Sequence, residues 1–172
     1  KMGGTIEFES KLDVGTTFRV TLPFRIDTAA APHAQAQQEE TDGTLDGAHI
    51  LLVEDNNLNM EIARFQLEKA GAQLTTATNG MEAVERFRNS APGTFDAILM
   101  DVMMPEMDGY QATRAIRAMN RPDATSVPII AMTANAFPED RQKALAAGMN
   151  EHLTKPLEAG PMFRTLRKFI RR

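Results

Sequence analysis

Apolar and polar positions alternate in two short stretches near the start of the chain. Residues 5–10 (TIEFES) and 17–22 (TFRVTL) follow the two-residue period that is typical of half-buried β-strands. The residues between them are of turn-forming types, so the pattern predicts a β-hairpin that ends near Pro23. One face of this hairpin carries Ile6, Phe8, Phe18, Val20 and Leu22.

The stretch that follows is poor in large apolar side chains. Leu45 is the only one between residues 28 and 47, where Ala, Gln and acidic residues dominate. Such a segment cannot bury enough apolar surface to form a core. We therefore interpret residues 25–47 as a flexible linker with a random-coil reach of about 25 Å. A transient helix is the alternative, because Ala and Gln favour helices.

From His49 onward, short apolar runs alternate with segments of helical length. Strands that are apolar along their length and alternate with helices indicate a parallel sheet covered on both faces. Residues 48–172 are thus predicted to form one α/β domain of five strand–helix units. The predicted strands are 49–53, 73–77, 97–100, 127–132 and 151–154, and the predicted helices are 57–70, 80–89, 109–119, 138–147 and 157–171.

The first predicted helix of this domain has the spacing of an amphipathic helix. Large apolar side chains recur at i, i+4 and i+7, and a second apolar stripe adjoins them. Gly71 is expected to end the helix as a C-cap. The apolar face is predicted to contain Leu58, Ile62 and Phe65, with Ala63, Leu67 and Ala70 on the adjoining stripe.

Composition removes several classes of function. The 172 residues include no cysteine, which excludes disulfides, thiolate metal sites and cysteine nucleophiles, and only three histidines. A net charge of −4 argues against a general nucleic-acid binder. No apolar run approaches the roughly 18 residues of a membrane span, so we expect a cytoplasmic protein. Since the chain opens in mid-pattern at Lys1, we interpret it as part of a longer protein.

Reactive side chains stand at the ends of successive predicted strands. Glu54 and Asp55 follow the first strand of the α/β domain, and Asp101 follows the third. Thr133 ends the fourth strand and Lys155 follows the fifth. Because functional residues of a doubly wound sheet gather at the carboxyl ends of its strands, we expect these groups to converge.

Such a cluster has a defined chemistry. Two unit charges 4 Å apart repel by about 4 kcal/mol at an effective dielectric constant of 20, so three carboxylates favour a bound cation. Oxygen ligands with open water positions suit Mg²⁺. Beside an ammonium and a hydroxyl, an aspartate and a metal can carry out phosphoryl transfer. Individually, each of these residues could instead be a turn, cap or surface residue.

Four motifs resemble the signatures of response-regulator receiver domains. They are residues 53–56 (VEDN), 100–109 (MDVMMPEMDG), 131–134 (AMTA) and 153–156 (LTKP). The resemblance covers about residues 49–171. It implies a flavodoxin-like fold, a doubly wound five-stranded parallel sheet of order 2-1-3-4-5 with helices on both faces.

The resemblance also assigns roles to the acidic residues. It implies that Asp101 is the phosphoacceptor and that Glu54 and Asp55 are the acidic pair for the Mg²⁺ cofactor. Asp101 and the backbone carbonyl of Met103 would complete the protein's metal ligands. A phosphate-ester hydrolase on the same fold is a rival, but it needs an acid or base at the position of Met103.

The remaining motifs imply a conformational switch. By resemblance, Thr133 is the switch hydroxyl, and Lys155 is the phosphate counter-ion in front of a cis peptide bond to Pro156. The family places an aromatic switch residue three positions before the lysine. His152 stands at that position here.

The hairpin has a resemblance of its own. Residues 2–6 and 18–24 resemble the end of a histidine-kinase ATP-binding domain, which would make 1–24 a fragment of that domain. The family's Gly-x-Gly turn is replaced here by Asp13-Val14-Gly15-Thr16. Kinase end, linker and receiver, in that order, resemble a hybrid sensor histidine kinase. Asn59, which follows the VEDN motif, also resembles the receivers of hybrid kinases.

These resemblances imply a place in a two-component phosphorelay. The receiver would take a phosphoryl group from a phosphohistidine of its own kinase core and pass it to a histidine phosphotransfer domain. The fragment lacks the kinase core and would catalyse only its own aspartyl phosphorylation and dephosphorylation. The parent would be anchored in the inner membrane, with this part in the cytoplasm and no nucleic-acid partner. A degenerate receiver that serves only as a docking module is the alternative.

Overall fold

The computed structural model describes residues 3–11, 15–23, 45–134 and 137–170. It divides the chain into two compact units, residues 1–38 and 39–172. Most of the predicted linker, residues 25–47, lies outside the described residues.

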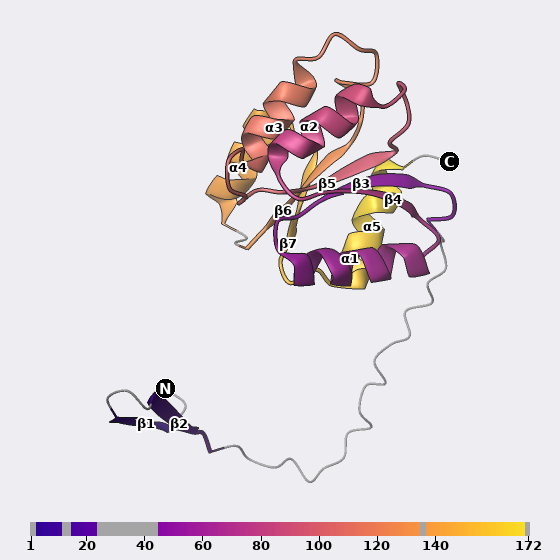
Figure 1. The fold of residues 1–172 in the computed structure, drawn as a ribbon. Helices are drawn as coiled ribbons and strands as arrows, with labels where there is room; N and C mark the ends of the chain where they lie inside the picture. Colours follow the sequence, from indigo (N-terminus) through magenta and orange to yellow (C-terminus); the bar gives the residue numbers. More distant parts are fainter. Residues whose placement is uncertain (1–2, 12–14, 24–44, 135–136, 171–172) are drawn as a thin grey trace. The chain divides into compact units, whose positions relative to one another are not determined.

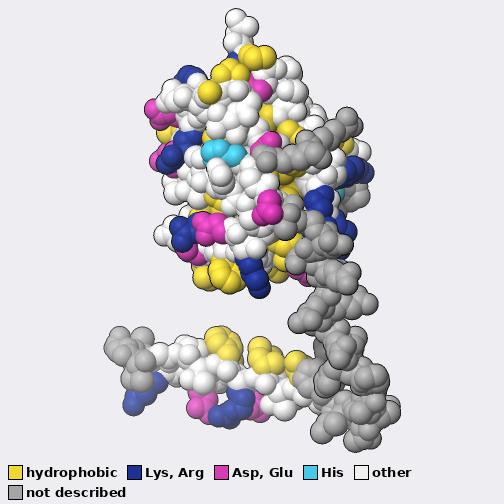
Figure 2. All heavy atoms as spheres, turned by 90° about the vertical axis from the view of Figure 1, so that its right-hand side faces the viewer, with side chains coloured by type: hydrophobic (Ala, Val, Ile, Leu, Met, Phe, Trp, Pro, Cys, Tyr) yellow, Lys and Arg dark blue, Asp and Glu magenta, His cyan; other side chains and the backbone are white. Residues whose placement is uncertain are grey.

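The first unit contains the predicted hairpin. Strands β1 (Thr5–Lys11) and β2 (Gly15–Thr21) pair antiparallel, with Phe8 opposite Phe18. Hydrophobic side chains gather on one side of the hairpin and charged ones on the other (Figure 2), as the alternating pattern predicts. The apolar side is exposed throughout within this unit.

The second unit is built on a parallel sheet of five strands in the order β4-β3-β5-β6-β7 (Figure 1). Counted from the first strand of this unit, that is the predicted order 2-1-3-4-5, and the predicted flavodoxin-like architecture is confirmed. The strands are β3 (His49–Val53), β4 (Gln73–Ala77), β5 (Ala97–Asp101), β6 (Ile129–Thr133) and β7 (Glu151–Thr154).

Helices cover both faces of this sheet. Helices α2, α3 and α4 lie on one face, and α1 and α5 lie on the other (Figure 1). Among the described residues, no helix is both long and apolar enough to cross a membrane. The helices are α1 (Asn57–Lys69), α2 (Gly80–Asn89), α3 (Gly109–Arg117), α4 (Pro138–Ala147) and α5 (Ala159–Phe169).

The sheet separates two hydrophobic clusters. Along β3, Leu51 and Val53 point into the cluster beneath α2 and α3, whereas Ile50 and Leu52 point into the cluster beneath α1 and α5. Successive side chains of a strand point to opposite faces, so a strand covered on both sides must be apolar at every position. This explains the uninterrupted apolar runs in the sequence.

Helix α1 faces the sheet with the adjoining stripe, which contains Ala63 and Leu67, and not with the predicted main apolar face. Leu58, Ile62 and Phe65 are 69%, 45% and 68% exposed, so the expected apolar face points away from the core. The buried positions are Met60, Ala63 and Leu67. Both stripes have helical spacing. The second one packs on the sheet, within the cluster beneath α1 and α5.

Leu45 is also an exception to the sequence interpretation. Assigned to the linker by its neighbours, it is 4% exposed and belongs to the cluster beneath α1 and α5. Its backbone N–H donates to the carbonyl of Ala70 at 2.7 Å, which joins it to the end of α1. The α/β unit therefore begins before residue 48. Burial of the large apolar side chain of Leu45 stabilises the packing of this segment against the core.

The first residue of α3 lies against the carboxyl end of β5. A Cβ on Gly109 would come within 2.2 Å of the carbonyl oxygen of Asp101 and 3.0 Å of the Met100 side chain. We expect Gly109→Ala to destabilise the α/β unit by about 1–3 kcal/mol through this clash. In an open helix the same change would stabilise by up to about 1 kcal/mol. Denaturant unfolding of Gly109→Ala and of the unmodified chain shows whether the variant is less or more stable. Arg114→Ala, at an exposed position of the same helix, is the control.

Candidate functional site

The predicted site residues meet at the carboxyl edge of the sheet. Glu54 follows β3, Asp101 ends β5, Thr133 ends β6 and Lys155 follows β7. Parallel pairing in register brings these strand ends together although up to a hundred residues separate them in the chain. The expected convergence is therefore observed for these four residues, and Asp55 joins them from the next position.

The three carboxylates form one cluster. Glu54, Asp55 and Asp101 each offer an oxygen, and these oxygens lie within 4.8 Å of one another. Glu54 and Asp101 are only 2% and 3% exposed, whereas Asp55 is open to solvent. Like charges this close repel strongly, and burial of two of them away from water increases the repulsion. A bound cation would offset it. The arrangement can hold a divalent metal through hard oxygen ligands, with Asp55 on the side from which water enters.

Lys155 provides the balancing charge of the protein itself. Its Nζ lies 2.6 Å from Oδ2 of Asp101 and 2.6 Å from Oε2 of Glu54. Burial alone would lower the pKa of Lys155, but hydrogen bonds and charges from the two carboxylates outweigh it and raise the pKa above 10.5. The ammonium is thus charged at neutral pH. The peptide bond from Lys155 to Pro156 is cis, as predicted.

Asp101 lies in the middle of the cluster. Its Oδ2 accepts a hydrogen bond from Lys155, and its Oδ1 accepts one from the backbone N–H of Met103 at 3.1 Å. Burial raises the pKa of this carboxyl above 3.8, with a further contribution from the charge of Glu54, while the two hydrogen bonds oppose the shift. Met103 itself presents an exposed side chain at the rim.

The two predicted switch residues lie on the same face of the sheet. Thr133 is buried at the end of β6 and pairs across the ladder with Thr154, two positions after His152. Since alternate residues of a strand share a face, Thr133 and His152 both face the side covered by α2, α3 and α4. The Nδ1 atom of His152 lies 3.4 Å from a carboxylate oxygen of Glu151.

One contact to the cluster was not predicted from the sequence. Nδ2 of Asn59 donates a hydrogen bond to Oε1 of Glu54 at 3.0 Å. The side chain of Asn56 caps α1 by accepting from the backbone N–H groups of Leu58 and Asn59. The sequence offered Asn59 only as part of a motif, because a pattern does not show which way a polar side chain on a helix turns.

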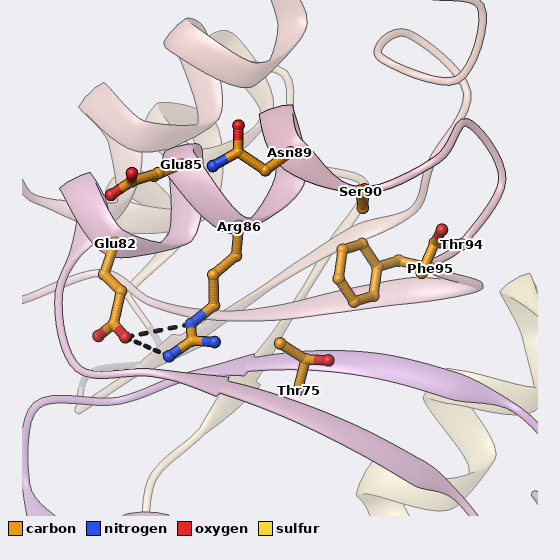
Figure 3. Close-up of a pocket in the computed structure, with 8 residues that line it drawn as sticks. All are labelled: Thr75, Glu82, Glu85, Arg86, Asn89, Ser90, Thr94 and Phe95. Carbon is orange, nitrogen blue, oxygen red and sulfur yellow. Dashed lines mark hydrogen bonds and ion pairs between the residues drawn. The ribbon is translucent and has the colours of Figure 1, made fainter.

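A separate hollow of about 470 Å³ lies between α2 and the edge of the sheet (Figure 3). Two of its charged lining residues pair with each other, since Nη2 of Arg86 lies 2.5 Å from Oε1 of Glu82 one helical turn earlier. None of the predicted site residues lines it, so it is distinct from the carboxylate cluster. The lining consists of Thr75, Glu82, Glu85, Arg86, Asn89, Ser90, Thr94 and Phe95.

Fold and site together define a flavodoxin-like protein with an acidic cluster and a lysine at the carboxyl edge of its sheet. The sequence matches the family described as the response regulator receiver domain over residues 50–167. The chain therefore belongs to the response regulator receiver family and is a receiver domain of two-component signalling.

The curated relatives carry the names of a histidine kinase and of a sensor protein. A probable histidine kinase 2 from Oryza sativa is 42% identical over 135 residues, which are 72% of this chain and 13% of that protein. The aerobic respiration control sensor protein ArcB of Escherichia coli is 34% identical over 175 residues, which span 98% of this chain and 21% of ArcB. The chain thus covers only a small part of the length of these relatives.

Solved structures show the same fold. The receiver domain of the sensor histidine kinase PA1611 from Pseudomonas aeruginosa, with a magnesium ion coordinated in its active-site cleft, has 43% identity and a TM-score of 0.65. That match covers 72% of this chain and 98% of the other. A chain from the complex of the Saccharomyces cerevisiae phosphotransfer protein Ypd1 with the Ssk1 receiver domain has 29% identity and a TM-score of 0.64. That match covers 73% of this chain and 90% of the other.

Proposed function

We propose that this chain contains the phosphoacceptor receiver of a hybrid sensor histidine kinase. It takes a phosphoryl group from a phosphohistidine onto Asp101 and passes it to a histidine phosphotransfer domain. One observation carries the proposal: a buried aspartate between an acidic pair and a lysine ammonium 2.6 Å away. The naming of one relative as a probable histidine kinase and of another as a sensor protein supports the hybrid parent.

The transfer requires no separate base. A carboxylate oxygen of Asp101 attacks the phosphorus of the phosphohistidine, and the P–N bond breaks as the new P–O bond forms. The ring nitrogen that departs keeps the bonding electron pair, and because the other ring nitrogen of the phosphohistidine carries a proton, the ring leaves as neutral imidazole. Lys155 stays protonated and neutralises charge on the phosphoryl oxygens, and the hydroxyl of Thr133 donates a hydrogen bond to one of them.

The residues present fit a Mg²⁺ ion. Glu54, Asp55 and Asp101 together carry three negative charges, and Lys155 offsets one, so the cluster has a net charge of −2 that a divalent cation balances. We propose these carboxylates and the backbone carbonyl of Met103 as its protein ligands. When bound, Mg²⁺ would neutralise charge on the phosphoryl oxygens and help to orient the phosphoryl group toward Asp101. The similar PA1611 receiver holds magnesium in its cleft.

Phosphorylation is proposed to act through Thr133 and His152. The hydroxyl of Thr133 would move toward the phosphoryl group, and His152 would follow into the space released. Their shared face of the sheet supports this coupling. The ring of His152 would then leave its position beside Glu151.

The hairpin is proposed to be the end of the kinase's ATP-binding domain. Its exposed apolar side suits a strand pair that packs against the rest of a larger domain. The alignment with ArcB extends over 98% of the chain and therefore includes this region. We further propose that the parent is anchored in the inner membrane with this part in the cytoplasm.

Mass analysis after incubation with a small phosphodonor and Mg²⁺ tests the proposal. We expect a gain of one phosphoryl mass that depends on Mg²⁺ and is reversed by hydroxylamine, which cleaves acyl phosphates. No mass gain, with the fold intact, would contradict the proposal and favour a degenerate receiver that serves only as a docking module.

The exposed apolar stripe of α1 is proposed as the docking surface for the phosphotransfer partner. Leu58, Ile62 and Phe65 begin three residues after Asp55 and form an apolar strip beside the site, which suits a protein partner. We expect Phe65→Glu to slow phosphotransfer with the parent organism's histidine phosphotransfer domains about tenfold. Uptake from a small phosphodonor should be unchanged. Leu145→Glu, on exposed α4, is the control; equal losses in both variants would contradict a docking role for the stripe.

A further inference from the structure

We propose that Asn59 is a positioning residue that holds Glu54 in place for the metal. The inference rests on the Mg²⁺ site of the proposed function and deepens it. The side chain of Glu54 is 1% exposed, so water cannot solvate its carboxylate. A buried carboxylate must obtain its hydrogen bonds from the protein.

Asn59 supplies one of these hydrogen bonds. Its Nδ2 donates to Oε1 of Glu54 at 3.0 Å. The other oxygen, Oε2, lies 2.6 Å from Nζ of Lys155. Lys155 also donates to Oδ2 of Asp101, so the two carboxylates share one ammonium. Asn59 is thus the neutral donor that serves Glu54 alone, whereas Lys155 is a charged donor that Glu54 shares with Asp101.

The two roles separate further when Asp101 is phosphorylated. The ammonium of Lys155 is then required by the phosphoryl group, which leaves Glu54 without a fixed neighbour on that side. Asn59 does not depend on this change, because it is anchored on α1 by the N-cap Asn56, whose side chain accepts from the Asn59 backbone N–H at 3.1 Å. It can hold Glu54 in both states.

A neutral donor at this position preserves the charge that the metal needs. An amide leaves the cluster of three carboxylates and one ammonium at a net charge of −2. A lysine or arginine would satisfy Glu54 equally well but would bring the charge to −1 and weaken the attraction for a divalent cation. The residue type therefore matches a role toward a metal better than a role in stability alone.

The test is a Mg²⁺ titration by calorimetry, since the chain has no tryptophan to report binding. Asn59→Leu keeps the size and removes the donor. We expect about tenfold weaker Mg²⁺ binding, in line with the loss of a hydrogen bond that orients a ligand. Asn57→Leu, a matched asparagine exposed in the same first turn, should bind Mg²⁺ as the unmodified chain does.

A double-mutant cycle separates positioning from a structural role. In a Glu54→Ala background, Asn59→Leu should cause no further loss of Mg²⁺ affinity, because nothing remains to position. A persisting tenfold loss in that background, or unchanged affinity in the single variant, would overturn the inference. Asn59→Ala repeats the test with a smaller side chain, and metal-free unfolding curves verify that each variant is folded. These readouts involve no phosphoryl group, so failure of phosphorylation would count against the proposed function alone.

Discussion

Asp101→Asn is expected to abolish phosphoryl uptake. The amide has the size of the carboxylate but lacks the anionic oxygen that attacks phosphorus, and Oδ2 of Asp101 is the oxygen to which Lys155 donates its hydrogen bond at 2.6 Å. We expect a rate at least about a thousandfold lower, because the nucleophile itself is removed. Mass analysis with a small phosphodonor and Mg²⁺ measures it. Glu106→Gln, in the exposed loop after β5, removes the same charge and serves as the control.

The same variant should be more stable than the unmodified chain when no metal is present. Burial raises the pKa of Asp101 above 3.8, so the folded chain holds this proton more tightly than the unfolded chain. Ionised Asp101 therefore costs stability, and the cost develops as the pH rises through the raised pKa. We expect Asp101→Asn to raise the midpoint temperature of thermal unfolding at neutral pH by about 2–5 °C. This difference between the variant and the unmodified chain should shrink as the pH falls toward about 4. Phosphoryl uptake that persists in this folded variant would refute the assignment of Asp101.

Asp55→Ala is expected to have the second-largest effect, on the metal. Removing one of three carboxylates changes the net charge of the cluster from −2 to −1 and deletes its solvent-facing ligand. We expect Mg²⁺ affinity to fall by about 10- to 100-fold, into or beyond the millimolar range. The metal-free fold should become more stable, because the repulsion among the carboxylates decreases.

Calorimetric titration and metal-free thermal unfolding measure these two effects. Glu61→Ala removes the same charge from exposed α1, at a residue that pairs with Arg64 and lies outside the cluster. It should leave Mg²⁺ affinity within about twofold, since exposed charges are screened by salt. Equal affinity in Asp55→Ala and the unmodified chain would contradict the metal geometry.

The position of the site followed from the sequence alone. The central strands β3, β5 and β6 are almost entirely apolar because both faces of the sheet are covered, and the sites of such sheets lie at the carboxyl ends of the strands. Glu54, Asp101, Thr133 and Lys155 stand at those ends in the linear sequence, so local pattern and topology together predicted their meeting. The hairpin was predictable for the same reason, because strand alternation is a local property.

The tertiary structure decided what periodicity leaves open. On α1, two stripes have helical spacing, and only contact with the sheet shows that Met60, Ala63 and Leu67 are buried while Phe65 is exposed. Leu45 is buried in a hydrophobic cluster to which residues far along the chain also belong. The bond from Asn59 to Glu54 depends on how α1 rotates relative to β3. Hydrophobic spacing records which positions avoid water, but the direction of a helix face and the partner of a polar side chain are set by the neighbours that pack against them.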